Sequence, residues 1–169
     1  MKPNEDQLCS AFAEMLRRSS TFASFILGRT KFASYATNAR LLHEEQMSIR
    51  PRKHSWRHWW CHVPELRKDR ETDIFAVFEV EVANSLFRFA LHIENKRNVS
   101  RFTEGQAQAY EPRAKHMLGR ADYLSYRDYE TMLIAPIAFR KRFPSDCDCF
   151  SSFIAYEELA KYVPLYGEV

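Results

Sequence analysis

The sequence predicts a mixed α/β domain in which helices flank a central sheet. Three observations lead to this fold class: an amphipathic N-terminal segment, two β-rich runs joined by turn residues, and later apolar runs separated by helical sequence. The chain has 169 residues, of which 46% are hydrophobic and 28% are charged. This length and balance are typical of one domain with a buried core, and they exclude a disordered segment.

The N-terminal part of the chain is predicted to be helical. Over residues 6–27, apolar side chains recur every three or four positions, which is the spacing of an amphipathic helix that ends near Gly28. A second helical stretch is expected over residues 36–47. We therefore assign residues 1–48 to the N-terminal helices of a single domain.

Residues 49–70 combine tryptophans with basic side chains. The tryptophans are Trp56, Trp59 and Trp60, and the interleaved basic residues are Arg50, Arg52, Lys53, Arg57, Arg67, Lys68 and Arg70. Indole rings stack on nucleobases and basic groups contact phosphates, so Trp56 and Arg57 are candidates for binding a nucleic-acid strand. Burial in the core is the alternative for any tryptophan. The net charge of +3 is too small to indicate a nucleic-acid binder by itself, although 17 of the 25 basic residues are Arg.

Two β-rich runs, residues 72–80 and 86–96, flank a turn-forming stretch at 81–85 and predict an antiparallel hairpin. Side chains alternate along the second run, so one face is apolar and the other carries Glu94 and Lys96.

The turn of this hairpin sets the register of its strands. A turn centred on residues 83–84 places Asp73 opposite Glu94 and Glu71 opposite Lys96. Two carboxylates that face each other destabilise a sheet unless something compensates their charge. Mg²⁺ or Mn²⁺ would compensate it, because hard cations take carboxylate oxygens as ligands.

A lysine beside such a metal site has a chemical use. The Lys96 ammonium could orient the attacking water or stabilise negative charge in a transition state at phosphorus. The alternative is a solvated ion-pair cluster on an exposed sheet face. Against it, residues 74–78 are all apolar, as expected for a strand that is covered on both faces.

A helix is expected after the hairpin. Thr103 and Gln106 have the spacing of a capping box, and Pro112 either kinks the helix or begins a second one that stops at Gly119.

The C-terminal part is predicted to add two strands and a helix. Residues 131–138 are apolar enough for a central strand, a short strand is expected around 153–155, and a helix over 157–162. The predicted order is helix, helix, hairpin, helix, strand, strand, helix.

Asp73 and the tripeptide Glu94-Asn95-Lys96 resemble the signature of the PD-(D/E)xK nuclease superfamily, whose core hairpin carries an Asp on one strand and Glu-x-Lys on the next. The resemblance implies a restriction-endonuclease-like αβββαβ fold. It covers residues 71–138, the catalytic core, in element order, and the terminal regions, including residues 139–169, match only in type. It also implies Mg²⁺-dependent hydrolysis of phosphodiester bonds, with DNA as the expected substrate.

Gln106 and Tyr110 resemble the Gln-x-x-x-Tyr motif of the exonuclease-like branch of that superfamily. Helical spacing of four places both side chains on one face. The resemblance implies that this face borders the active site and positions the substrate strand. An ordinary helix surface with a half-buried aromatic ring is the alternative.

Members of the superfamily often recruit one more acidic residue from an N-terminal helix. Glu14, Glu44 and Glu45 are the candidates, and Glu45 is the one we favour as a third metal ligand. Thr72 stands where the eponymous pattern has Pro, which many members also lack.

Two other functional hypotheses stay open. A catalytically inactive copy of the fold would bind nucleic acid or a protein partner without cleavage. A zinc-organised interaction protein would use side chains from His54, His58, His62, Cys61, Cys147 and Cys149, although their spacing matches no compact structural zinc pattern.

The cellular location of the chain is predicted from the absence of membrane-span and signal-peptide patterns in this sequence. No apolar run has the roughly 18 to 20 residues of a bilayer span, and the start has no apolar stretch of the signal-peptide type, so we expect a cytoplasmic protein without a membrane partner. The four cysteines are expected to be free thiols. A domain this small would often need a second copy to cut both strands of a duplex, so a homodimer is one possible assembly.

Overall fold

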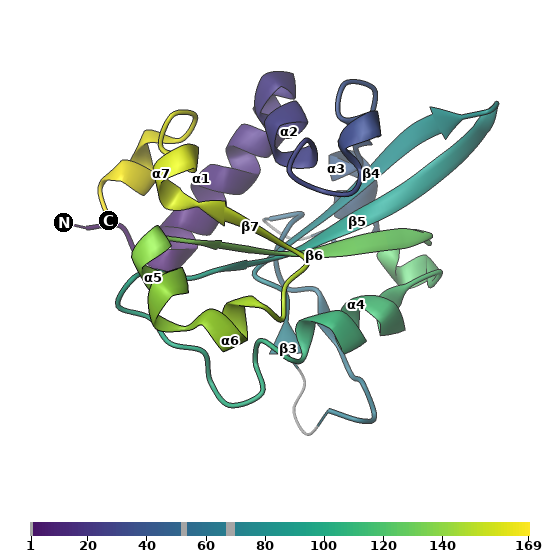
Figure 1. Ribbon diagram of the computed structural model, residues 1–169. Helices are drawn as coiled ribbons and strands as arrows, with labels where there is room; N and C mark the ends of the chain where they lie inside the picture. Colours follow the sequence, from purple (N-terminus) through teal and green to yellow (C-terminus); the bar gives the residue numbers. More distant parts are fainter. Residues whose placement is uncertain (1, 52–53, 67–69) are drawn as a thin grey trace.

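The computed structural model describes residues 2–51, 54–66 and 70–169, and these residues form a mixed sheet with helices on both faces (Figure 1). The predicted α/β class is confirmed. Within these residues the sheet has five strands in the order β1 (Arg40–Leu41), β4 (Ile74–Val82), β5 (Ser85–Asn95), β6 (Asp128–Ala135) and β7 (Ser152–Ala155). The first three pair antiparallel, and β5, β6 and β7 pair parallel. A separate ribbon pairs β2 (Trp60–Cys61) with β3 (Arg70–Glu71).

The β4–β5 hairpin has the predicted register. Its pairs run from Ile74 opposite Ile93 to Val82 opposite Ser85, so the turn consists of residues 83–84. Both turn residues have positive φ, 48° and 61°, which is the backbone of a type I′ turn and matches the twist of the strands.

One predicted pair of this hairpin is wrong. Glu71 does not face Lys96, because Glu71 belongs to β3 and pairs with Trp60. The backbone N–H of Lys96 instead donates to the carbonyl of Ile134 on β6, at 2.9 Å. The ladder between β4 and β5 therefore ends at Ile74, one residue after Asp73.

The predicted first helix is two helices, α1 (Glu5–Arg18) and α2 (Ser20–Leu27). Ser19 between them is extended, with φ −122° and ψ 107°, and its hydroxyl accepts from the N–H of Phe22 at 3.1 Å. A serine that caps the following helix stabilises a break where apolar periodicity alone predicts continuity. The predicted end of the helical segment at Gly28 is confirmed.

The helix predicted over 36–47 is wrong in its first half. The chain forms η1 (Ala33–Tyr35), then β1, and only then α3 (His43–Ile49). In β1, Arg40 pairs with Glu79 of β4 through both the ladder and an ion pair of 3.0 Å. These tertiary contacts override local helix propensity.

The region after the hairpin becomes helical later than predicted. Turns occupy residues 104–109, and α4 (Tyr110–Met117) follows with Pro112 in its first turn, where proline is tolerated. The structure therefore agrees better with a helix that begins near Pro112 than with a longer helix that Pro112 kinks. Gly119 has φ 74°, a conformation that glycine adopts without strain, and it follows the end of the helix as predicted.

The C-terminal strands are confirmed with shifted bounds. β6 begins three residues before the predicted strand and ends ahead of Pro136, and β7 covers the predicted 153–155. The predicted last helix is shorter, as α7 (Tyr156–Leu159), and η3 (Pro164–Gly167) follows it. The sequence did not predict the helices α5 (Ile137–Arg142) and α6 (Pro144–Cys147).

Each face of the sheet has its own core. Helices α1, α2 and α7 cover one face, where the apolar side chains of β4 and β5 alternate toward them (Figure 1). On the other face, Phe75 and Val77 pack with Trp59, with Met117 of α4 and with η2 (Ala121–Tyr123). Burial on both faces confirms the prediction drawn from residues 74–78.

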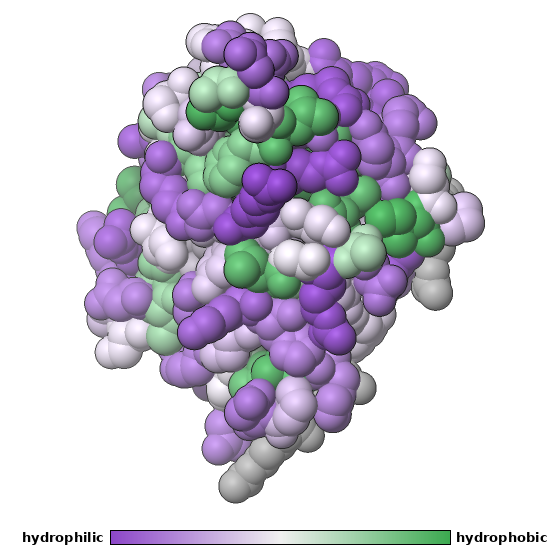
Figure 2. Space-filling model, turned by 90° about the vertical axis from the view of Figure 1, so that its right-hand side faces the viewer, coloured by the Kyte–Doolittle hydropathy of each residue, from purple (hydrophilic) through white to green (hydrophobic). Residues whose placement is uncertain are grey.

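The hairpin tip extends away from both chain termini, which lie close together at the other side of the molecule (Figure 1). The face at this end of the sheet is mostly hydrophilic, with apolar groups that are small and separate (Figure 2). Val82 and Leu86 next to the turn are 39% and 60% exposed. Among the described residues, no helix has both the length and the apolar character that a membrane span requires.

Candidate active site

The structure brings Asp73 and Glu94 together at the end of the hairpin opposite to its tip. Asp73 directly precedes β4, and Glu94 is the next-to-last residue of β5. The Oδ2 atom of Asp73 accepts from the backbone N–H of Asn95 at 2.9 Å. The hydroxyl of Tyr110 connects the two acidic residues, because it donates to Glu94 Oε2 and accepts from the Asp73 N–H at 3.4 Å.

Glu94 is fully buried, and three donors surround its carboxylate. Oε1 accepts from Lys96 Nζ at 2.6 Å and from Gln106 Nε2 at 2.7 Å, while Oε2 accepts from the Tyr110 hydroxyl. The predicted face of Gln106 and Tyr110 is therefore directed at the acidic residues. Gln106 reaches Glu94 from a turn and not from a helix, since α4 begins at Tyr110.

Lys96 stands between two carboxylates. Its Nζ lies 2.6 Å from Glu94 Oε1 and 3.7 Å from Oε1 of Glu5, and the side chain is only 7% exposed. Burial alone lowers the pKa of Lys96, but the charges of Glu94 and Glu5 outweigh burial and leave the pKa above its ordinary value of 10.5. Lys96 is therefore a protonated donor and not a base.

Glu5 is the third carboxylate of the cluster, and the sequence analysis did not single it out. It lies in the first turn of α1, and its Oε2 accepts from the hydroxyl of Ser100 at 3.1 Å. Burial raises the pKa of Glu5, Lys96 opposes the rise and Glu94 adds to it. We call Glu5, Asp73 and Glu94, together with Lys96, the acidic cluster.

Helix periodicity contains a signal for Glu5. The buried side of α1 consists of Leu8, Cys9, Phe12 and Leu16. Glu5 precedes the first two of these by three and four residues, so it heads the same stripe and points toward the sheet.

The favoured N-terminal ligand, Glu45, is not part of the cluster, and this prediction needs correction. Glu45 pairs with Arg40 at 2.8 Å, and Arg40 also contacts Glu79. Glu79 lies six residues along β4 from Asp73, roughly 20 Å at the rise of a strand. Glu14 pairs with Arg17 on α1 and is not in the cluster either.

A small polar pocket of about 40 Å³ gives access to Asp73 and Glu5. Asp6, Glu71, Trp56 and Arg57 also line it. Burial, together with the nearby charge of Glu94, raises the pKa of Asp73 well above its ordinary value of 3.8. The lining of the pocket contains four carboxyl groups and one arginine.

The predicted strand-binding residues Trp56 and Arg57 lie in the wall of this pocket. Arg57 donates to Asp6 Oδ1 at 2.9 Å, and its guanidinium lies 5.9 Å from the centre of the Trp56 ring. The other two tryptophans differ from Trp56: Trp59 is a fully buried core residue, and Trp60 is 47% exposed. Arg52, Lys53, Arg67 and Lys68 of the predicted basic segment lie outside the described residues.

No family model, curated protein or solved structure matches the chain.

The donor set of the cluster fits Mg²⁺ or Mn²⁺. Within the described ranges, no group of three or more His, Cys, Asp or Glu side chains is placed so that together they could hold one metal ion. Mg²⁺ does not require such a cage, because one or two carboxylates with waters and substrate phosphates complete its octahedron. Asp73 with Glu5 or Glu94 would supply those oxygens. Burial first, and the nearby charge of Glu94 in addition, raise the pKa values of Asp73 and Glu5, so a bound cation would stabilise their ionised forms.

The zinc alternative gains no support from the same residues. Cys61 packs in the core with Trp59, whereas Cys147 packs in a different core with Tyr110. The four cysteines, all within the described residues, form no disulfide, as predicted.

Two further buried groups support the site. His92 is enclosed between the hydroxyls of Thr72 and Tyr126, and burial lowers its pKa well below 6.5, so it is a neutral neighbour. The sequence did not indicate a role for Arg113. Its buried guanidinium lies 4.3 Å from the centre of the ring of Tyr110, and the hydroxyl of Tyr110 donates to Glu94.

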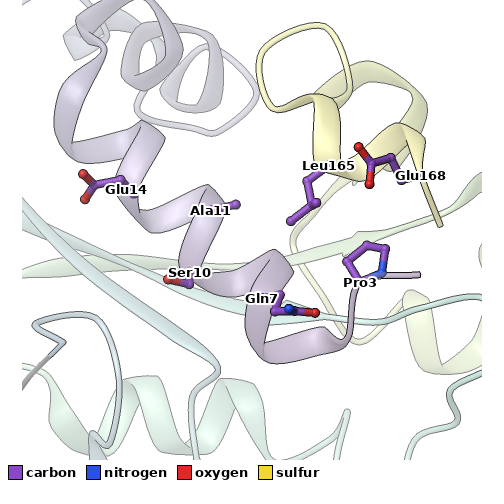
Figure 3. Close-up of a pocket in the computed structure, with 7 residues that line it drawn as sticks. All are labelled: Pro3, Gln7, Ser10, Ala11, Glu14, Leu165 and Glu168. Atoms are coloured by element: carbon purple, nitrogen blue, oxygen red, sulfur yellow. The ribbon is translucent and has the colours of Figure 1, made fainter. Parts of the chain in front are cut away.

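A separate hollow of about 440 Å³ lies between α1 and the C-terminal segment (Figure 3). Its lining includes Glu14, Leu165 and Glu168 and no residue of the acidic cluster. Figure 3 shows the two glutamates on opposite walls, an arrangement that does not favour phosphate binding.

Proposed function

We propose that the chain is a metal-dependent nuclease that hydrolyses phosphodiester bonds, with a restriction-endonuclease-like core. The observation that carries the proposal is the convergence of Glu5, Asp73, Glu94 and Lys96 at one end of a hairpin, beside a polar pocket. The order α1, β1, β4, β5, α4, β6 supports the fold, because it reads helix, three strands, helix, strand once the intervening α2, η1, α3, η2 and the separate β2–β3 ribbon are set aside.

In this proposal Asp73 and Glu94, with Glu5, would hold one or two Mg²⁺ or Mn²⁺ ions, which supply Lewis-acid stabilisation and lower the pKa of a bound water. Lys96 Nζ donates to the attacking water or to a phosphate oxygen, and it stabilises the charge that develops there. Gln106 and Tyr110 orient the Glu94 carboxylate. Water adds to phosphorus and loses a proton to solvent, the P–O ester bond breaks, and the leaving oxygen takes a proton from solvent to become an alcohol. A preference for DNA over RNA rests on the family resemblance.

One observation favours the second candidate function, a catalytically inactive module that binds nucleic acid or a protein partner. Both oxygens of Glu94 already accept from protein donors, so this carboxylate is satisfied without a metal. Asp73 and Glu5 argue for the nuclease, since a binding module has no need for two further carboxylates of raised pKa in the same pocket.

The deciding experiment incubates the chain with single-stranded, duplex and branched DNA and with RNA, in Mg²⁺, in Mn²⁺ and in EDTA. We expect cleavage that requires the metal and is lost in Glu94→Ala. Glu79→Ala is the matched control, because it removes the same side chain from the same hairpin at a position outside the cluster. Binding in EDTA without metal-dependent cleavage of any substrate would favour the inactive module.

A further inference from the structure

A second cavity, of about 200 Å³, opens beside the acidic pocket. Its lining includes Glu14, Arg17, His43, His54, Ser55 and Trp56. Trp56 lines both this cavity and the pocket of Asp73, so the two hollows adjoin across one indole ring. We call the second hollow the Trp56 cavity.

The two hollows differ in charge. The pocket of Asp73 is lined by four carboxylates and one arginine, whereas the Trp56 cavity is lined by Arg17 and Glu14, which form an ion pair of 2.8 Å, and by two histidines. Glu14 also pairs with Arg18, so the carboxylate of this lining is neutralised by arginines. A nucleic-acid strand fits this difference, because only the reacting phosphate has a metal to bring it close to carboxylates, and a neighbouring phosphate is repelled less where no negative charge is in surplus.

The indole of Trp56 is held in place from two sides. The His54 ring lies 5.3 Å from it, at 38°, and the Arg57 guanidinium lies 5.9 Å away. Trp56 is only half-buried and lines both hollows, so part of its ring system is open to a ligand. A fixed, accessible aromatic ring is the group that stacks on a nucleobase, whatever the base.

The size of the Trp56 cavity restricts the form of the ligand. At about 200 Å³ it is smaller than the roughly 300–1,000 Å³ of pockets for drug-sized molecules. It accommodates one ring system and not a duplex, whose paired bases are stacked on each other and closed to an indole.

We propose that the Trp56 cavity is the subsite for one unpaired nucleotide next to the scissile phosphate. Its base stacks on Trp56, and Arg17 with His43 and His54 holds its phosphate. The substrate class is thereby a single strand or an unpaired end. The adjacency to a scissile phosphate rests on the proposed function, whereas binding of the unpaired nucleotide does not.

The test measures binding by fluorescence anisotropy in EDTA and in Ca²⁺, with a labelled oligothymidylate and a labelled blunt hairpin duplex of equal phosphate number. Trp56→Leu keeps an apolar side chain in the core contact but removes the stacking ring. We expect this variant to bind the single strand about tenfold more weakly and the duplex within about twofold of the wild type. Trp56→Phe, which retains a ring, should recover most of the loss.

Two controls make the test specific. Trp60→Leu removes an indole that is 47% exposed outside the cavity, and it should leave both affinities unchanged. Arg17→Gln should weaken single-strand binding and reduce the slope of log K against log salt concentration by about one unit. Arg18→Gln should change the affinity and the slope less, since Arg18 does not line the cavity.

The outcomes separate this inference from the proposed function. If Trp56→Leu leaves single-strand binding unchanged, or weakens duplex binding equally, the subsite is refuted even when the chain cleaves DNA. If the expected binding pattern appears without cleavage of any substrate, the nuclease proposal fails and the subsite stands.

Discussion

Two charged clusters lie on the same hairpin and differ in how their charge is compensated. Toward the tip, Glu79 accepts from Arg40 at 3.0 Å and from Arg88 at 2.8 Å, and Arg40 also pairs with Glu45 at 2.8 Å. Two acidic residues face two arginines, so we call this the balanced cluster. At the other end, the acidic cluster sets three carboxylates against the single ammonium of Lys96.

The pKa values of the two clusters move in opposite directions. Hydrogen bonds from Arg40 lower the pKa of Glu45, and hydrogen bonds from Arg88 lower that of Glu79. In the acidic cluster, burial and neighbouring carboxylates raise the pKa values of Asp73 and Glu5. The protein neutralises its own charge in the first cluster and leaves a surplus in the second. This surplus in a buried pocket is the reason why we propose a cation site there.

The largest expected effect comes from removing the lysine of the acidic cluster. Lys96→Ala should reduce hydrolysis by about 100- to 1000-fold, because the charge that develops at phosphorus loses its donor, while Mg²⁺ affinity stays largely intact. Arg40→Ala in the balanced cluster should keep activity within about twofold of the wild type. Single-turnover cleavage rates measure both, and circular dichroism checks the fold. Undiminished cleavage in Lys96→Ala would refute the role assigned to this residue.

The two N-terminal glutamates give the next comparison. Glu5→Gln should lower activity about 10- to 100-fold, as expected for a residue that holds or orients a metal, whereas Glu45→Gln should leave activity near that of the wild type. The rate is measured at several Mg²⁺ concentrations, because a lost ligand is partly rescued by more metal. The reverse ranking of the two variants would restore Glu45 to the site and remove Glu5.

The smallest expected effects are changes in the free energy of unfolding without metal, and we expect opposite signs for Asp73→Asn and Glu79→Gln. The raised pKa of Asp73 means that its ionised form destabilises the folded state, so Asp73→Asn should raise the free energy of unfolding at pH 7 by about 1 kcal/mol. The lowered pKa of Glu79 means that its ionised form stabilises the fold, so Glu79→Gln should lower that free energy by about 0.5–1 kcal/mol.

The pH dependence of these two variants follows from the same shifts. The contribution of Asp73 is favourable below its ordinary pKa of 3.8 and is lost as pH rises through its folded pKa. The contribution of Glu79 is present above 4.5 and is lost as pH falls through its folded pKa. Urea unfolding in EDTA between pH 4 and 7 measures both. The same sign for both variants at pH 7 would contradict the contrast between the clusters.

The hairpin and most of its site could be predicted because their determinants are local. Turn chemistry at residues 83–84 fixes the register, and the register fixes which residues oppose Asp73. The spacing from Gln106 to Tyr110 was also informative, although Gln106 lies in a turn.

The errors arose where distant segments determine the outcome. Residues 40–41 form a strand because β4 offers them an edge, and no local pattern shows that edge. The prediction of Glu45 fails because its place is decided by pairing with Arg40, a contact that no helical pattern shows. For Glu5, the buried stripe of α1 contained the missing signal.

The central claim is that the acidic cluster binds a divalent cation and the balanced cluster does not. Calorimetric titration of Mn²⁺ into the wild type, Asp73→Asn and Glu79→Gln tests it without depending on any substrate. We predict binding to the wild type that is unchanged in Glu79→Gln and at least about tenfold weaker in Asp73→Asn. Absence of binding to the wild type, or equal affinity in Asp73→Asn, would contradict the claim.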